Sequence, residues 1–363
     1  MRPATAVIDL AALRHNLAVA KARAGGARVV AVVKANGYGH GAARLLPALG
    51  AADMLGVACI EEALGLREAG AVQTILLMEG VFEADELPLC ARLGFDIVVH
   101  EPGQIRMLEQ ARLDHPLAVW LKINTGMNRL GFRPEEVPAA LDRLQGCVAV
   151  ASGIRLMTHF ASADEPSSPA TREQIRRFAA TAEGLGLERS FCNSAGLLAW
   201  PEAHAEWVRP GIMLYGVSPL EGRTGAEEGL RPVMTLETRL IAVREVRAGE
   251  AVGYAGTWRA EAPTRIGIAA MGYGDGYPRH APSGTPVLVN GSEAPLAGRV
   301  SMDMLAIDLS GQPEARVGDP VILWGAGLPV ETIAAAAGTI AYELLCGITG
   351  RVHVELRDGP PPD

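Results

Sequence analysis

The chain has few of the features that mark secreted, membrane-spanning or metal-stabilised proteins. Its 363 residues include only five cysteines, with no Cys-x-x-Cys pair, so we expect reduced, packed thiols and no structural metal site. No uninterrupted run of about 18 apolar residues occurs, which excludes a transmembrane helix. The N-terminus reaches Asp9 without the sustained apolar stretch of a secretory signal. We therefore expect a cytoplasmic protein that makes no use of a membrane.

Positive charge is also scarce. The sequence has 33 Lys and Arg against 41 Asp and Glu, a formal net charge of −8 at pH 7. Such a chain repels a phosphate backbone, and no basic cluster interleaved with aromatic residues offsets the repulsion. We therefore expect no nucleic-acid partner.

What the sequence does contain is typical of a globular protein of two domains. Apolar residues make up 49% of the chain and charged residues 20%, a balance that excludes wholesale disorder. A length of 363 residues exceeds what one small core accommodates and favours two domains.

Short apolar runs alternate with helical patterns through the first 215 residues, which is typical of a parallel sheet built from βα units. The expected strands are Val29–Val33, Asp53–Ala58, Gln73–Met78, Phe95–Val99, Leu117–Ile123, Gly153–Thr158, Ser190–Asn193 and Gly211–Tyr215. Glu101–Arg112 and Pro169–Leu185 are expected helices, the second of which starts after the N-cap signal Ser168. Eight such strands predict a closed (β/α)8 barrel of the TIM type.

After about residue 230 the pattern changes to short strands punctuated by Gly and Pro. The expected strands are Thr238–Val243, Arg265–Ala270, Pro286–Val289, Leu305–Leu309 and Pro320–Trp324. We therefore predict a barrel domain over residues 1–228 and a mainly β domain over residues 229–363.

Polar residues follow several barrel strands, where barrels of this type assemble their chemistry. Lys34 closes an apolar strand, and a desolvated lysine amine forms imines with carbonyl compounds. The alternative is an ordinary strand-end lysine that reaches solvent. The glycines that follow, Gly37, Gly39 and Gly41, favour a close approach of backbone to a ligand, although tight turns also use them.

A second candidate lies near the end of the barrel, where phosphate sites recur. In residues 209–212 the backbone N–H groups of Gly211 and Ile212 could face a phosphate, with the Ser194 hydroxyl beside them. The alternatives are a surface ion pair for Arg209 and a helix N-cap for Ser194. His159, taken alone, fits a buried structural histidine.

These residues lie in segments through which the chain resembles the alanine racemase family along nearly its whole length. The segment AVVKANGYGHG at residues 31–41 is similar to the family's pyridoxal-phosphate attachment site. The other matching segments, in the family's order, are residues 122–131, 158–161, 193–195, 209–211, 253–254, 272–276 and 298–304.

The resemblance implies that Lys34 carries pyridoxal 5'-phosphate and acts as the base on the D-alanine side. It assigns the L-alanine side to Tyr254 of the partner subunit, so the active sites of a homodimer are shared. Two bases on opposite faces are needed because the proton leaves one face of Cα and returns to the other. An ordinary tyrosine, with a pKa near about 10, is a poor base, and the resemblance gives it His159, linked to Arg209, as a partner.

Further roles are implied by position. Arg209 faces the pyridine nitrogen of the cofactor, and an always-charged guanidinium leaves that nitrogen unprotonated, which favours proton return over other reactions. Arg129 contacts the cofactor's phenolic oxygen and the substrate carboxylate. The remaining assignments are phosphate binding by Tyr38, Ser194, Gly211, Ile212 and Tyr342, substrate binding by the backbone N–H of Met302 of the partner subunit, an entrance narrowed by Tyr273 and Tyr342, and carbamylation of Lys122.

Three other interpretations stay open at this point: a racemase of broader or different substrate, a non-catalytic pyridoxal-phosphate carrier, and an unrelated barrel with an incidental lysine. The sequence also leaves open whether the role is biosynthetic, with D-alanine supplied for the cell wall, or catabolic.

Overall fold

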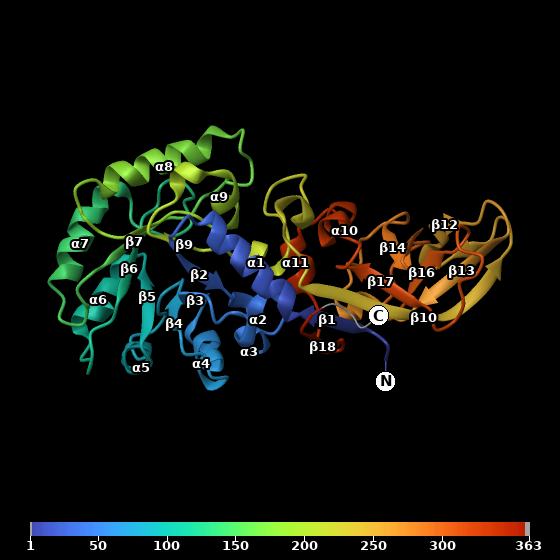
Figure 1. Ribbon diagram of the computed structural model, residues 1–363, viewed down its shortest axis with the longest axis horizontal. Coiled ribbons are helices and arrows are strands. Elements are labelled where there is room, and N and C mark those ends of the chain that lie inside the picture. Colours follow the sequence, from blue (N-terminus) through green and yellow to red (C-terminus); the bar gives the residue numbers. More distant parts are fainter. Residues whose placement is uncertain (1, 360–363) are drawn as a thin grey trace. The chain divides into compact units, whose positions relative to one another are not determined.

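The computed structural model describes residues 2–359, which form two compact units (Figure 1). Arg14–Leu214 and Ser218–Arg223 make up the barrel unit, and the other described residues make up the second unit. Within the described range, none of the helices has both the length and the apolar character needed to cross a bilayer.

The barrel unit is a closed ring of eight parallel strands, which confirms the predicted (β/α)8 architecture. The strands are β2 (Arg28–Val32), β3 (Met54–Val57), β4 (Thr74–Leu77), β5 (Phe95–Val99), β6 (Val119–Lys122), β7 (Arg155–Met157), β8 (Arg189–Ser190) and β9 (Trp207–Val208). The helices are α1 (Leu10–Arg23), α2 (Lys34–Tyr38), α3 (Ala42–Leu45), α4 (Ile60–Glu68), α5 (Glu86–Leu93), α6 (Pro102–Gln110), α7 (Val137–Gln145), α8 (Pro169–Ala182) and α9 (Ser194–Ala199). Helices α4 to α8 lie outside the strands (Figure 1).

The eighth strand is not where the sequence pattern put it. Trp207–Val208 forms β9, and Ile212–Tyr215, expected as part of a strand, is a 3-10 helix. Strand-like hydrogen bonds continue only as far as Pro210, whose carbonyl accepts from the Val32 N–H. The next N–H, that of Gly211, donates to the side chain of Ser194 instead of to a neighbouring strand, so the ladder ends there.

The barrel interior is apolar in the middle and ionic at one end. The buried cluster consists of Val30, Met54, Leu76, Val98, Trp120, Met157 and Trp207. Beside it Arg155 bonds both Asp96 (2.9 Å) and Glu188 (3.0 Å), while the two tryptophan indoles donate to the same carboxylates. Paired and hydrogen-bonded in this way, the partly buried charges are tolerated, and they leave the other end of the barrel for chemistry.

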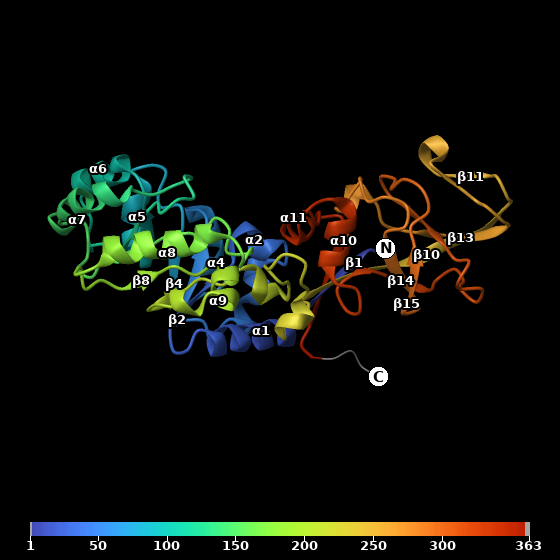
Figure 2. The same cartoon turned by 90° about the horizontal axis from the view of Figure 1, so that it is seen from above.

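The second unit is built on an eight-stranded sheet with the order β15-β14-β17-β10-β1-β18, to which β13 and β16 add through β10. Its strands are β1 (Thr5–Asp9), β10 (Met234–Val246), β13 (Thr264–Ala269), β14 (Pro286–Val289), β15 (Ser292–Pro295), β16 (Leu305–Asp308), β17 (Pro320–Trp324) and β18 (His353–Arg357). Two helices, α10 (Val330–Ala337) and α11 (Ala341–Cys346), follow β17. The hairpin of β11 (Ala251–Val252) and β12 (Trp258–Arg259) stands away from the sheet (Figure 2).

Strand β1 shows how the chain divides between the units. It pairs antiparallel with β10 and parallel with β18, so the N-terminal segment lies in the second unit, although the sequence pattern grouped residues 1–228 together. The Asp9 carboxylate then accepts from the Ala11 and Ala12 N–H groups at the start of α1, which caps the helix that leads to the barrel.

Candidate active site

Lys34 follows β2 at the start of an unusual turn. Residues 35 to 38 all have positive φ, between 52° and 65°, so α2 is a left-handed turn. Such a run is costly for residues with a Cβ atom, and of the four only Gly37 has none. Several hydrogen bonds hold it: Ala35 N–H donates to the Glu62 carboxylate (2.6 Å) and the Asn36 side chain accepts from Ala42 N–H (3.0 Å). Backbone strain stored this way is typical of functional sites.

An anion cradle lies between α2 and the end of β9. Ser194 Oγ accepts from the N–H groups of Gly211 (2.8 Å) and Met213 (3.3 Å). A Cβ atom built on Gly211 would lie only 2.4 Å from the Tyr38 hydroxyl, which shows how closely that hydroxyl approaches the backbone. The hydroxyls of Tyr38 and Ser194 therefore lie beside two backbone N–H groups, which Ser194 Oγ engages here, and groups of these kinds bind phosphate in proteins.

The structure decides the alternative role of Ser194. The N-cap of α9 is Asn193, whose side chain accepts from Gly196 N–H at 2.9 Å. Ser194 is the first residue of α9, and its Oγ accepts from the Gly211 N–H instead. The interpretation of Ser194 as the helix cap was therefore wrong.

Arg209 is buried, with 2% of its surface exposed, and the alternative of a surface ion pair was wrong. It donates to the Ser190 hydroxyl, to the Thr158 carbonyl (2.5 Å) and to the Phe191 carbonyl (3.3 Å). All of these partners are neutral, and its Nε has none among the described residues. Burial lowers the pKa of Arg209 to about 10, so it remains cationic at neutral pH. A buried guanidinium with a spare donor fits a ligand acceptor.

Lys122, at the end of β6, lies within the electrostatic reach of the other cations. Its pKa is lowered to about 8, first by burial and then by the positive charges of Arg209, Arg129 and Lys34. The pKa of His159 is also well below its ordinary value, first because of burial and then because of the same positive charges. The structure thus brings these predicted residues together. The concentration of positive charge favours anionic ligands, and it keeps the imidazole neutral.

Arg129 is exposed on a closed loop after β6. The loop ends are joined by backbone bonds between Asn124 and Phe132 (2.8 Å) and between Phe132 and Lys122 (2.9 Å). Inside it the Asn124 side chain accepts from the N–H groups of Gly126 and Asn128. The loop therefore presents Arg129 on a braced backbone.

The remaining candidates belong to the second unit. Tyr273 and Met302 lie on adjacent segments, since Tyr273 N–H bonds the Ser301 carbonyl (3.0 Å) and Gly274 N–H bonds that of Met302 (2.9 Å). Tyr254 follows β11 and is 66% exposed. Tyr342, on α11, is exposed as well.

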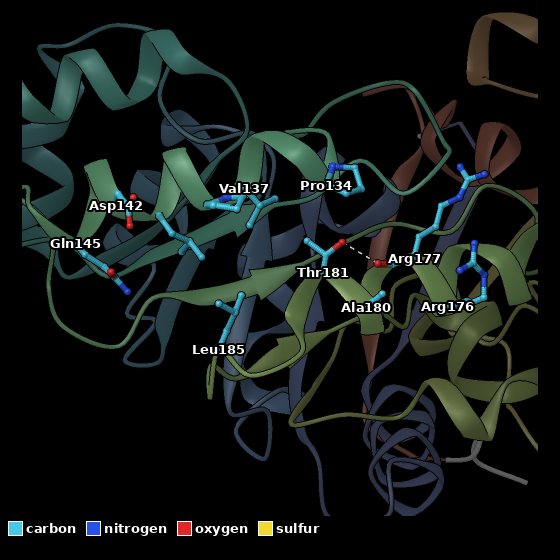
Figure 3. Close-up of a pocket in the computed structure, with 11 residues that line it drawn as sticks. Pro134, Val137, Asp142, Gln145, Arg176, Arg177, Ala180, Thr181 and Leu185 are labelled. Atoms are coloured by element: carbon cyan, nitrogen blue, oxygen red, sulfur yellow. Dashed lines mark hydrogen bonds between the residues drawn. The ribbon is translucent and has the colours of Figure 1, made fainter.

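A larger hollow, of about 570 Å³, lies elsewhere, between α7 and α8 (Figure 3). Its lining is largely apolar, and its two arginines, Arg176 and Arg177, both pair with Glu173. None of the candidate residues lines it, so the candidate site remains at the end of the barrel where Lys34, Lys122 and Arg209 lie.

Sequence reasoning missed two buried threonines near the candidate residues at the end of the barrel. Thr125 and Thr158 bond each other through their hydroxyls (2.7 Å), and Thr158 also donates to the Ile123 carbonyl (2.9 Å). They tie the loop after β6 to the loop after β7. Their signal was position, because Thr158 follows β7 directly and Thr125 comes three residues after β6.

Comparison with known proteins agrees with this geometry. The model for "Alanine racemase, N-terminal domain" matches residues 8–219, and that for "Alanine racemase, C-terminal domain" matches residues 233–356. Alanine racemase of Vibrio vulnificus is 53% identical over 98% of this chain and 99% of its own, and the biosynthetic alanine racemase of Escherichia coli is 53% identical over 99% and 100%. The crystal structure of the biosynthetic enzyme of Pseudomonas aeruginosa, 52% identical, superposes with a TM-score of 0.95 over 98% of this chain and 100% of its own. The matches cover both units, including the segments that carry Lys34 and the anion cradle, and the chain therefore belongs to the alanine racemase family.

Proposed function

We propose that the chain interconverts L-alanine and D-alanine with pyridoxal 5'-phosphate bound at Lys34. The observation that carries the proposal is the convergence, at one end of the barrel, of this lysine with an anion cradle and three further cations. Relatives of the same length and about half-identical sequence are named alanine racemases, which supports the substrate.

The residues present fit the cofactor. Tyr38, Ser194, Gly211 and Ile212 would hold its phosphate, and Lys34 would carry its aldehyde carbon. Arg209 would donate to the ring nitrogen, and since its pKa is still about 10, its own proton stays in place at neutral pH. When bound, the cofactor withdraws electrons from Cα of the amino acid and so makes that C–H bond acidic.

Two bases would serve the two faces of Cα. Lys34 takes or returns the proton on the D side, and Tyr254 of the partner subunit does so on the L side. A tyrosine acts as a base only where its phenolate is stabilised. The positive charges around His159 supply that stabilisation once Tyr254 of the partner subunit approaches the imidazole.

Substrate binding would depend on the anionic carboxylate. Arg129 and the backbone N–H of Met302 of the partner subunit hold it, while Tyr273 and Tyr342 narrow the entrance to a small side chain. The lowered pKa of Lys122, about 8, provides enough neutral amine near pH 7 for carbamylation, and the resulting anion would orient Arg129.

The partner in this scheme is a second copy of the chain. Three residues of the second unit that the scheme assigns to the substrate support it, because they are exposed in a single chain and are thus accessible to a partner. They are Tyr254, Tyr273 and Met302. We further propose that the dimer works in the cytoplasm and supplies D-alanine for the cell wall. The word "biosynthetic" in the names of two relatives supports the supply of D-alanine.

The test is the purified protein with pyridoxal phosphate and L-alanine in deuterated buffer. We expect circular dichroism to decay to zero while deuterium enters Cα, and serine to react more slowly. Borohydride should fix the cofactor on Lys34, as a peptide map would show. A protein that exchanges no small amino acid contradicts the proposal.

A further inference from the structure

Four side chains connect the loops at the chemical end of the barrel in neighbouring pairs. These loop staples are Glu62, Gln104, Gln174 and Ser194. They join the loops after β2 and β3, after β4 and β5, after β6 and β7, and after β8 and β9, in that order. Each staple comes from an early turn of the helix that follows one strand of its pair.

The chemistry of each staple matches the groups that it meets. Glu62 faces two donors, the N–H groups of Ala35 (2.6 Å) and Ala58 (2.9 Å), and a carboxylate has two acceptor oxygens for them. Gln104 faces one donor, His100 N–H (2.9 Å), and two acceptors, the carbonyls of Glu79 and Val81 (3.1 Å each). Only an amide offers one acceptor oxygen and two N–H donors. The residue types are therefore dictated by the loops.

Gln174 makes the same three bonds at the loops that carry the candidate residues. Its oxygen accepts from Ala161 N–H (2.9 Å), and its Nε2 donates to the His159 carbonyl (2.9 Å) and to the Thr125 hydroxyl (3.1 Å). It is buried, with 3% of its surface exposed. A buried group with all its hydrogen bonds made holds its neighbours firmly, and its removal takes this partner from the Ala161 N–H and the His159 carbonyl, while Thr125 keeps its bond to Thr158.

The network continues from Gln174 to the centre of the site. The Thr125 hydroxyl bonds that of Thr158 (2.7 Å), and the Thr158 carbonyl accepts from Arg209 (2.5 Å). Gln174 thus lies at one end of a continuous polar chain whose other end is the guanidinium proposed to face the cofactor.

We infer that Gln174 is a positioning residue, which sets Arg129 on the loop after β6 and His159 on the loop after β7 for action on one substrate. The inference rests on the proposed function, because that function assigns the carboxylate to Arg129 and the phenolate to His159. Gln174 touches neither substrate nor cofactor. It acts through the backbone of His159 and Ala161 on one loop and through the Thr125 side chain on the other.

Gln104 provides a matched control. It is equally buried, with 4% of its surface exposed, and makes the same three kinds of bond, but its two loops carry none of the residues assigned to the reaction. Replacing either glutamine by methionine keeps length and volume while removing the hydrogen bonds. The two variants should therefore lose similar stability and differ only in catalysis.

The experiment compares wild type, Gln174→Met and Gln104→Met in the cofactor-loaded enzyme, with Tm and racemisation kinetics per bound cofactor. We expect similar falls in Tm, a loss of about tenfold or more in kcat/KM for Gln174→Met, since small displacements of positioned groups are costly, and a change below about twofold for Gln104→Met. The loss should be equal from L- and D-alanine, because the equilibrium constant between enantiomers is one.

A conservative pair separates positioning from stability. Gln174→Glu keeps the acceptor for Ala161 N–H but sets its other oxygen against the His159 carbonyl, which cannot donate. The Thr125 hydroxyl can turn to donate to that oxygen if Thr158 donates to Thr125 instead of to Ile123. We therefore expect kcat/KM below that of wild type and above that of Gln174→Met. Gln104→Glu faces two carbonyls that cannot donate, so its Tm should be no higher than that of Gln104→Met.

The outcomes distinguish the two ideas. An active wild type in which Gln174→Met and Gln104→Met have the same kcat/KM overturns the role of Gln174 alone. A wild type that racemises no alanine overturns the proposed function and this inference with it. If Gln174→Met fails to fold, a Gln174→Glu variant with wild-type kcat/KM overturns the inference.

Discussion

Replacing Gly211 by alanine should weaken cofactor binding through a single steric contact. The new Cβ would lie 2.4 Å from the Tyr38 hydroxyl oxygen and 3.1 Å from the ring carbon that bears it. Gly211 is not among the residues of positive φ, so alanine brings no backbone strain. The contact with Tyr38 is therefore the main effect of the change.

The size of the effect follows from that distance. Non-bonded heavy atoms are comfortable at about 3.5 Å, so the hydroxyl has to retreat by about 1 Å. Overpacking of this kind costs about 1–3 kcal/mol. If the cost falls on the cofactor complex, in which the Tyr38 hydroxyl binds phosphate, the dissociation constant rises about tenfold for each 1.4 kcal/mol. We expect an increase of about ten- to a hundredfold.

A double-mutant cycle tests this reasoning. Tyr38→Phe removes the hydroxyl and leaves the nearest atom at 3.1 Å, so Gly211→Ala should add little to it. The dissociation constant of pyridoxal phosphate is measured by titrating the apoenzyme, with Gly65→Ala as control because a Cβ there meets nothing within 4 Å. Strictly additive effects of the two changes would refute the steric argument.

Two further predictions concern the bases and a buried histidine. In deuterated buffer Lys34→Ala should abolish exchange at Cα from both enantiomers, whereas Tyr254→Phe should slow exchange from L-alanine by about a hundredfold or more and from D-alanine much less; equal losses would contradict the two-base scheme. Burial lowers the pKa of His40 from 6.5 to about 4. Between pH 6.5 and 4 the unfolded chain therefore binds a proton on this histidine that the native state does not bind. The free energy of unfolding should fall by up to about 3 kcal/mol as the pH drops over this range. Urea unfolding at several pH values measures it, and a His40→Asn variant with the same slope as wild type would show the assignment to be wrong.

The barrel could be predicted from the sequence because its strands are local signals. Buried strands read as short apolar runs whatever lies beside them, and seven of the eight were located within a few residues. The lysine after β2 and the histidine after β7 could be singled out for the same reason, since a polar residue directly after such a run marks the chemical end of a barrel strand. Their roles came from resemblance, not from spacing.

Gln174 was missed, although the sequence carried a signal for it. It shares the buried face of α8 with Thr171, Phe178 and Ala182, at spacings of three, four and eight residues. A polar residue on a buried helical face has to find hydrogen-bond partners there. Which partners it finds depends on the loops of two other strands, and no local pattern contains them.

The sequence by itself determined the barrel, seven of its eight strands and the residues that follow them, because backbone hydrogen bonding and apolar periodicity are local properties. Tertiary structure decided the rest. Strand β1 joins β10 and β18, more than 200 residues away, and the Gly211 N–H turns to Ser194 rather than to a strand. In both cases the hydrogen-bond partner lies far along the chain, so only the folded chain selects it.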